Sequence, residues 1–173
     1  MWMMRWRLRL PTIPLLQAGQ RAEVLEQTMT TALRAALAMT DAELVKRTPV
    51  GVSGRASSAW TQRVEIVSSR PLNLLGQNVN ITPYALPLDA GQTPHWPPWG
   101  PGSDLALWAK RKLGDEKAAF LVARSIARGT TRGTAITGVQ MVQQTLAATR
   151  QPILAVFHAA RRHLARRWMG GGA

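Results

Sequence analysis

A long helical pattern runs from Gly19 to Arg47. Apolar and small side chains recur in it at spacings of three and four residues, which places them in one stripe along a helix. The stripe consists of Val24, Leu25, Thr28, Ala32, Leu33, Ala36 and Leu37. Pro49 predicts the end of the helix, because a proline pushes the residue before it out of the α region. The pattern therefore predicts a long first helix with one apolar face.

The beginning of the chain alternates with a period of two, which is typical of a strand with one apolar and one wet face. The apolar positions are Trp2, Met4, Trp6, Leu8 and Leu10, and the others are Met3, Arg5, Arg7 and Arg9. Pro11 and Pro14 end the strand, because proline cannot donate to a β-ladder. We expect residues 1–18 to form a strand-like arm. Its tryptophans must be covered either by the rest of the domain or by a neighbouring subunit.

Two further strands are predicted at Ala59–Val67 and Gln77–Tyr84, joined as a wide antiparallel hairpin. The segment Leu86–Gly102 is rich in proline, and we expect no regular structure in it. Trp96 and Trp99 within this segment indicate an ordered surface loop with aromatic anchors.

Two short helices are predicted next. Ser103 is a suitable N-cap for a helix through Leu113, which Gly114 ends. Asp115 caps a second helix that continues to about Ala127. Together the elements predict an α+β fold with a small antiparallel sheet, a long N-terminal helix and several C-terminal helices.

A last helical tract is predicted from near Thr137 to Trp168, with an interruption at Pro152, which fits the first turn of a new helix. After Pro152, apolar residues share the helix with Arg161, Arg162, Arg166 and Arg167, spread over about half the circumference. The resulting organisation is an arm at 1–18, a core domain at 19–150, and a basic helix with a glycine-rich tail at 151–173.

The chain is strongly basic, with 22 Lys and Arg against nine Asp and Glu, a formal net charge of +13. Glu116 is its last acidic residue, so nothing after it can neutralise the C-terminal basic residues locally. This balance favours a polyanionic partner, either nucleic acid or an acidic protein surface. The four-arginine helix could also lie on a membrane surface or be a core-packed helix with an ordinary solvated face.

Nothing in the sequence predicts a catalytic, cofactor or metal site. No serine stands in a Gly-x-Ser-x-Gly context, the chain has no cysteine, and His158 and His163 point away from each other on a helix. No apolar run is long enough to span a membrane, and arginines interrupt the first ten residues, which therefore lack the apolar core of a signal peptide. We expect a soluble protein that is not secreted by that route.

A series of short motifs resembles the neck or tail-completion proteins of long-tailed bacteriophages, the gene-product-ten-like head–tail joining family. The motifs are Thr48-Pro49-Val50 with Gly54, Arg55, Ser57, Ser58 and Trp60; Tyr84-Ala85 with Asp89 and Gly91; the proline-rich loop Pro94–Pro101; Leu105 with Trp108; and Ile126-Ala127-Arg128-Gly129-Thr130. They cover residues 19–150 in the family's order. Gly51 and Val52 depart from it, because they replace an Asp-Thr pair, and one residue is inserted before Trp60.

The resemblance implies a non-enzymatic virion protein that forms a six- or twelve-fold ring between head and tail. Its partners would be further copies of itself, other neck, connector or tail proteins, and the genomic DNA in the lumen, with no cofactor and no small-molecule substrate. It would act in the virion after assembly in the host cytoplasm. Candidate subunit contacts are Trp2, Met4, Trp6, Leu8, Trp96 and Trp99. The alternative is a stand-alone basic nucleic-acid-binding protein.

Overall fold

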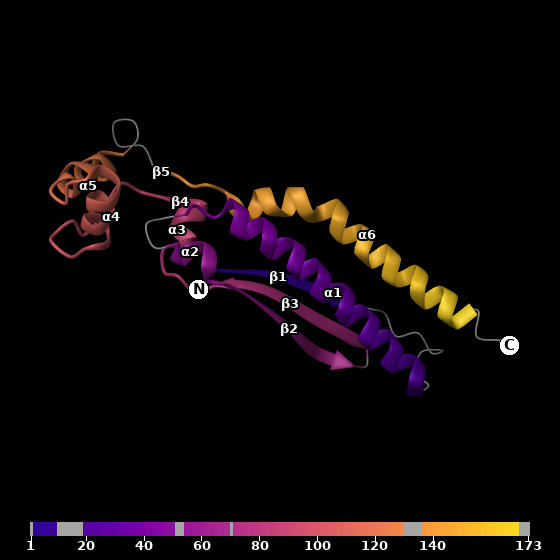
Figure 1. The fold of residues 1–173 in the computed structure, drawn as a ribbon. Coiled ribbons are helices and arrows are strands. Elements are labelled where there is room, and N and C mark those ends of the chain that lie inside the picture. Colours follow the sequence, from indigo (N-terminus) through magenta and orange to yellow (C-terminus); the bar gives the residue numbers. More distant parts are fainter. Residues whose placement is uncertain (1, 10–18, 51–53, 70, 130–135, 170–173) are drawn as a thin grey trace.

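A computed structural model describes residues 2–9, 19–50, 54–69, 71–129 and 136–169. The fold is α+β, as expected (Figure 1). The strands are β1 (Trp2–Arg9), β2 (Trp60–Ser69), β3 (Leu72–Asn80), β4 (Gly91–Gln92) and β5 (Ile136–Thr137). The helices are α1 (Gly19–Arg47), α2 (Arg55–Ser58), α3 (Ala85–Ala90), α4 (Asp104–Leu113), α5 (Ala118–Arg128) and α6 (Met141–Met169).

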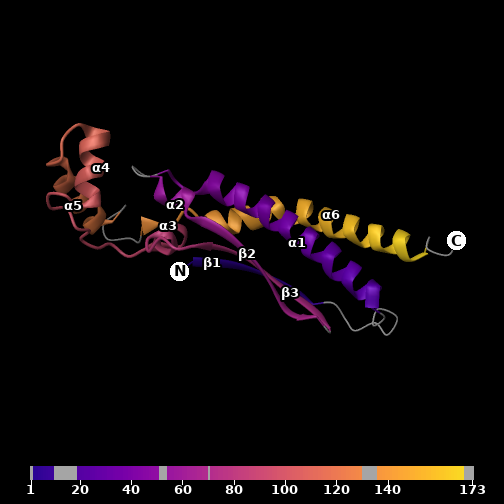
Figure 2. The same cartoon turned by 60° about the horizontal axis from the view of Figure 1, so that its bottom comes forward.

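Three strands form an antiparallel sheet in the order β1-β3-β2. The register aligns Met4, Asn78 and Gln62 in one row across the sheet. Two residues further along the strands, Trp6, Gly76 and Val64 form another row. Because successive side chains on a strand point to opposite faces, these rows belong to one face and the intervening rows to the other. The first face packs against the two long helices (Figures 1 and 2).

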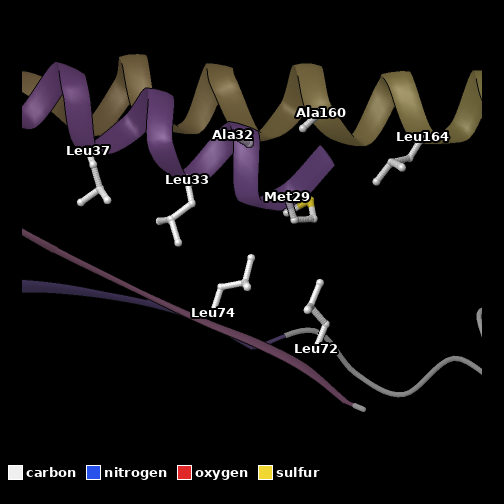
Figure 3. Close-up of a cluster of buried hydrophobic side chains, with 8 residues drawn as sticks. All are labelled: Met29, Ala32, Leu33, Leu37, Leu72, Leu74, Ala160 and Leu164. Atoms are coloured by element: carbon white, nitrogen blue, oxygen red, sulfur yellow. The ribbon is translucent and has the colours of Figure 1, made fainter. Parts of the chain in front are cut away.

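Helices α1 and α6 each contain 29 residues and run antiparallel along the sheet. They form the helical layer of a two-layer structure, in which both contribute to one apolar core (Figure 3). The buried members of the core are Met29, Ala32, Leu33, Leu37, Leu72, Leu74, Ala160 and Leu164. Each fully buried leucine stabilises the fold by about 1.5–3 kcal/mol relative to an exposed one, so this core holds the two layers together.

Gly76, in the central strand, lies directly against α1. A Cβ added there would lie 2.9 Å from Cδ1 of Leu33 and 3.2 Å from Cδ1 of Leu37. The missing side chain therefore lets α1 pack directly on β3.

The first strand is part of this fold, which corrects the prediction of a separate arm. β1 pairs along its whole length with β3, from Trp2 opposite Asn80 to Arg9 opposite Asn73. The side chains of Met4, Trp6 and Leu8 face the helices because the alternation matches the register of the sheet.

The hairpin between β2 and β3 is tighter than predicted. β3 begins at Leu72 and ends at Asn80, whereas the sequence suggested Gln77–Tyr84 after a wide loop. The reason is that Pro71, Asn73 and Gly76 are residue types typical of turns, whereas Asn73 and Gly76 pair with both neighbouring strands in the structure. Asn78 Nδ2 donates to the Thr40 hydroxyl at 2.6 Å and Asn80 Nδ2 donates to the Ala56 carbonyl at 2.7 Å, so the NH2 group of each buried amide has an acceptor.

Helices α4 and α5 form a small lobe at the end of the molecule, away from the sheet (Figure 1). Ser103 caps α4 by accepting a hydrogen bond from the Ala106 N–H, and Gly114 ends it at a φ of 78°, as predicted. The buried residues of the lobe are the small side chains of Ala106, Ala109, Ala119 and Ala123, so it has a thin core. Strands β4 and β5 pair with each other where the lobe joins the body.

Two further predictions are corrected. The proline-rich segment contains α3 and β4, because its first residues, Leu86 to Gln92, continue regular structure before most of the prolines begin. Pro152 lies inside α6 and does not divide it. The side chain after it, Ile153, is buried, so tertiary packing along α6 offsets the cost of an interior proline, about 3 kcal/mol. The basic segment from residue 151 is accordingly the second half of one helix that begins at Met141.

Candidate interaction surfaces

The four arginines of the basic helix are all exposed on α6. Leu164, between them in sequence, is buried in the core, and Trp168 packs partly against it. At 3.6 residues per turn, Arg162 and Arg166 lie on the side of α6 opposite Leu164. Arg161 and Arg167 flank that side, so the set spans about 240° of the helix rather than the half circumference predicted.

These side chains are available to a partner. Within the described part of the chain, no ion pair or side-chain hydrogen bond involves Arg161, Arg162, Arg166 or Arg167. Exposed guanidinium groups of this kind bind carboxylates or phosphates through paired N–H donors. The same N–H donors can therefore bind the phosphates of a nucleic acid or the carboxylates of an acidic protein.

The tryptophans of the proline-rich segment form an exposed aromatic cluster on the small lobe. Trp96 stacks on Phe120 of α5 with 6.1 Å between ring centroids, and Trp99 meets the same ring edge-on at 5.1 Å. The exposed fractions are 57% for Trp96, 45% for Trp99 and 39% for Phe120. Leu107 and Leu121 on the same lobe are exposed at 49% and 64%. The anchoring was expected from the sequence, but Phe120 as its partner was not, because only the fold brings α5 to this loop.

The other candidate contacts, on β1, lie in the interior of the chain itself. Met4 is only 6% exposed, and Trp6 and Leu8 pack partly buried against the core (the side chain of Trp2 is outside the described part). Their burial corrects the idea that these three side chains are a free face for a neighbouring subunit.

Two residues of the phage-like motifs join α1, β2 and α6. The Thr48 hydroxyl donates to the Leu44 carbonyl at 2.6 Å and accepts from Trp60 Nε1 at 2.9 Å. It also lies 3.4 Å from Sδ of Met141, at the start of α6. Thr48, the first residue of the Thr-Pro-Val motif, is thus part of a structural junction in this protein.

A third motif residue holds the N-terminus of α6. The buried carboxylate of Asp89 accepts from the Val142 N–H at 3.0 Å, and the Asp89 carbonyl accepts from the Gln140 N–H at 3.0 Å. An acidic group at this position satisfies an unpaired helix N–H and complements the helix dipole. Gly138 is required beside it, because a Cβ there would collide with the backbone of Asp89 and Gly91.

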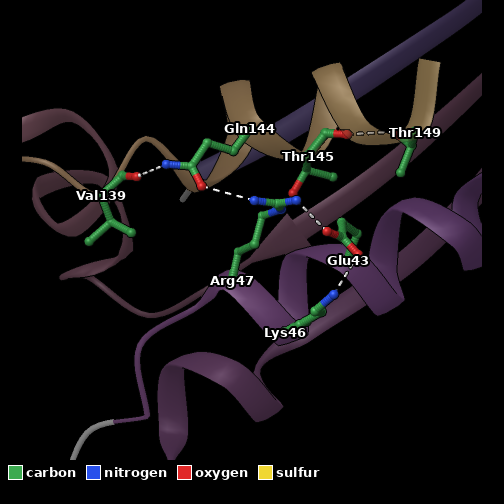
Figure 4. Close-up of polar contacts among 7 residues, drawn as sticks. All are labelled: Glu43, Lys46, Arg47, Val139, Gln144, Thr145 and Thr149. Carbon is green, nitrogen blue, oxygen red and sulfur yellow. Dashed lines mark hydrogen bonds and ion pairs between the residues drawn. The ribbon is translucent and has the colours of Figure 1, made fainter.

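A polar network strengthens the same junction on its solvent side (Figure 4). Arg47 forms an ion pair with Glu43 on α1 and donates to Gln144 Oε1 on α6 at 2.9 Å. Gln144 Nε2 in turn donates to the Val139 carbonyl at 2.9 Å. The C-terminal end of α1 is thereby fixed to the N-terminal end of α6.

The described residues contain no group of three or more histidines, aspartates or glutamates that could hold a metal ion. His95, His158 and His163 are all exposed, and Nδ1 of His95 lies 3.2 Å from the Thr93 carbonyl oxygen. Gly51 and Val52, where the sequence departs from the phage-like pattern, lie outside the described residues. Among the described helices, none combines the length and hydropathy needed to cross a bilayer.

No protein-family model, curated protein or solved structure matches this chain.

Proposed function

We propose that the chain is a structural component of a tailed-phage virion, which assembles into a six- or twelve-fold neck ring joining head to tail around the DNA channel. Other neck, connector or tail proteins would bind the two ends of the ring. The proposal starts from the order of the short motifs between residues 19 and 150. Three of their residues, Thr48, Trp60 and Asp89, have joint structural roles at the α1–β2–α6 junction, which supports treating them as one pattern.

The observation that carries the proposal is the exposed aromatic cluster of Trp96, Trp99 and Phe120 on the small lobe. Aromatic residues are enriched in protein–protein interfaces, and contiguous exposed apolar patches mark such sites. A ring needs two different complementary surfaces on every subunit, because its contacts are heterologous. The cluster supplies one of them, in a lobe that extends beyond the main body (Figure 1).

The second surface would be on the long helices. Exposed apolar side chains there are Met39 and Val45 on α1 and Leu146 and Leu154 on α6. Insertion of the aromatic cluster between such side chains of the next subunit would bury area that is exposed in the isolated chain. The arginines of α6 would then face either the DNA in the lumen or an acidic neighbour.

The exposed basic side chains also favour a second candidate, a stand-alone nucleic-acid-binding protein. This protein would bind DNA as a monomer, with an affinity that falls steeply with salt because each neutralised phosphate releases counterions. Its oligomeric state distinguishes it from the ring protein.

Light scattering of the purified protein over a range of concentrations tests the proposal. Wild type should form a species of six or twelve subunits, alone or on phage heads, and the Trp96→Ala/Trp99→Ala variant should shift to smaller species. Leu107→Lys/Leu121→Lys tests the same lobe with the aromatic cluster intact, and Val50→Lys/Ile81→Lys places the same charges at exposed sites outside it. A wild type that stays monomeric in solution and on heads contradicts the ring.

A further inference from the structure

The three-stranded sheet has one face that no described helix covers. Helices α1 and α6 both lie on the opposite side, over the row that contains Trp6 and Gly76 (Figures 1 and 2). The alternate residues of β1, β3 and β2 therefore point away from the helical layer. Neither the aromatic cluster nor the α6 arginines lie on this second face.

The uncovered face is basic. β1 contributes Arg5, Arg7 and Arg9, and β2 contributes Arg63 together with the only acidic residue of the face, Glu65. All five side chains are exposed. The central strand contributes uncharged residues, which are Asn73, Leu75, Gln77 and Val79. We call the surface formed by Arg5, Arg7, Arg9 and Arg63 the arginine face.

The register sets the spacing of the arginine face. Arg5 and Arg63 lie in the same row, on either side of Gln77, so their strands are about 9.6 Å apart at the usual strand separation. Along β1, successive arginines are about 6.7 Å apart, because every second residue points to the same face. One strand of a DNA duplex advances about 3.4 Å along its axis per phosphate, so each arginine of β1 can meet a different phosphate.

Local partners neutralise little of this charge. Arg63 Nη2 is 4.0 Å from Glu65 Oε2, and the side chains are 71% and 49% exposed, which makes a loose pair of small energetic value. Arg5 Nε contacts the uncharged Sδ of Met3 at 2.7 Å. Like charges on one sheet face repel each other unless an anion lies between them.

The chemistry of the face favours phosphates over a protein or a membrane. The hot spots of protein interfaces cluster in well-packed, desolvated pockets at their centre, and membrane binding requires apolar side chains that insert. The apolar residues Met3, Leu75 and Val79 of this face are buried or half-buried, and the exposed Val67 lies at the bulge near the end of β2, away from Arg5 and Arg63. What the face exposes is guanidinium groups, with the amides of Asn73 and Gln77 beside them, and these are donors for phosphate oxygens.

We propose that the arginine face binds the phosphate backbone of nucleic acid without reading its sequence. It lies on the opposite side of the molecule from Arg162 and Arg166, which point away from the core. A straight duplex cannot contact both surfaces of one subunit, so the two surfaces can be tested separately. This inference does not depend on the ring.

Two matched variants of the full chain test the proposal. Arg5→Gln/Arg7→Gln/Arg9→Gln/Arg63→Gln and Arg161→Gln/Arg162→Gln/Arg166→Gln/Arg167→Gln each remove four positive charges, which lowers the formal net charge from +13 to +9. Binding to a fluorescent 20-base-pair duplex is measured by anisotropy at several salt concentrations. The slope of log affinity against log salt should fall by up to about 3.6 in the first variant and by less than half as much in the second. A loss in the second variant measures what the α6 arginines contribute to duplex binding, and an unchanged slope in the first variant overturns the proposal.

A second pair of variants keeps the test decisive if the first quadruple variant does not fold. Glu65→Gln removes the acidic residue of the arginine face, and Glu23→Gln removes an exposed acid on α1. The first should tighten duplex binding and steepen its salt dependence, whereas the second should leave both near wild type. Identical curves for the two variants refute the assignment. So does tighter binding of wild type to polyglutamate than to a duplex of equal charge.

Discussion

The indole Nε1 of Trp60 donates a 2.9 Å hydrogen bond to the hydroxyl of Thr48, across twelve residues of sequence. This contact joins the first residue after α1 to the first residue of β2, and both side chains are buried. Removing one partner leaves the other buried without a hydrogen bond, which costs about 1–3 kcal/mol. Thr48→Val should therefore lower the free energy of unfolding, measured in urea, by that amount.

A double-mutant cycle separates this hydrogen bond from the packing around it. Trp60→Phe alone should also destabilise, and the Thr48→Val/Trp60→Phe double variant should lose less than the sum, with a coupling of about 0.5–1.5 kcal/mol. Strict additivity of the two losses would show that the hydrogen bond contributes nothing.

Gly76→Ala should destabilise the contact between helix α1 and the sheet. The new Cβ would lie 2.9 Å from Cδ1 of Leu33, so the layers must separate or the leucine must leave its rotamer, at a cost of about 1–3 kcal/mol. Gly100→Ala is the matched control, because nothing lies within 4 Å of a Cβ at that position. Thermal unfolding of the two variants compares them, and equal midpoints would contradict the close approach.

Asp89→Asn should weaken the start of α6. The amide keeps an oxygen for the Val142 N–H but loses the negative charge at the helix N-terminus, and we expect a loss of about 0.5–2 kcal/mol in unfolding free energy. Glu65→Gln, on the exposed sheet face, removes the same charge without a helix contact and should stay within about 0.5 kcal/mol of wild type. An Asp89→Asn variant as stable as Glu65→Gln would exclude the capping role.

Removal of residues 1–9 should unfold the monomer rather than release an arm. β1 is paired with the central strand, and Met4 is buried against Leu44, Trp60 and Met141. Far-ultraviolet circular dichroism of the truncated chain reports the outcome. A cooperative transition at the wild-type temperature would restore the interpretation of this segment as a separable arm.

Local signals were sufficient where one segment determines its own structure. The limits of α1 followed from its apolar stripe and Pro49, and those of α4 from Ser103 and Gly114. They failed at β3, because Asn73 and Gly76 are residue types of a loop and acquire strand geometry only through pairing with β1 and β2. The predicted interruption at Pro152 was wrong for a similar reason, because tertiary packing of α6 keeps the helix continuous through this residue.

Some features of the candidate surfaces can likewise be predicted from one segment, and others depend on the tertiary fold. Exposure of the α6 arginines follows from the spacing of the apolar residues around them, which one segment contains. The meeting of Arg5 with Arg63 on one face requires β1 to lie beside β3, and pairing over some 70 residues is not visible in either strand alone. Phe120 under the two tryptophans is likewise a product of the tertiary fold.

Electron microscopy of the purified protein mixed with tail-less phage heads is the most direct measurement of the proposed role. The ring account predicts a collar of six or twelve copies at one vertex of each head, and its loss with the Trp96→Ala/Trp99→Ala variant. Heads that remain bare while the protein coats free DNA as single copies would contradict the ring and support the nucleic-acid-binding alternative.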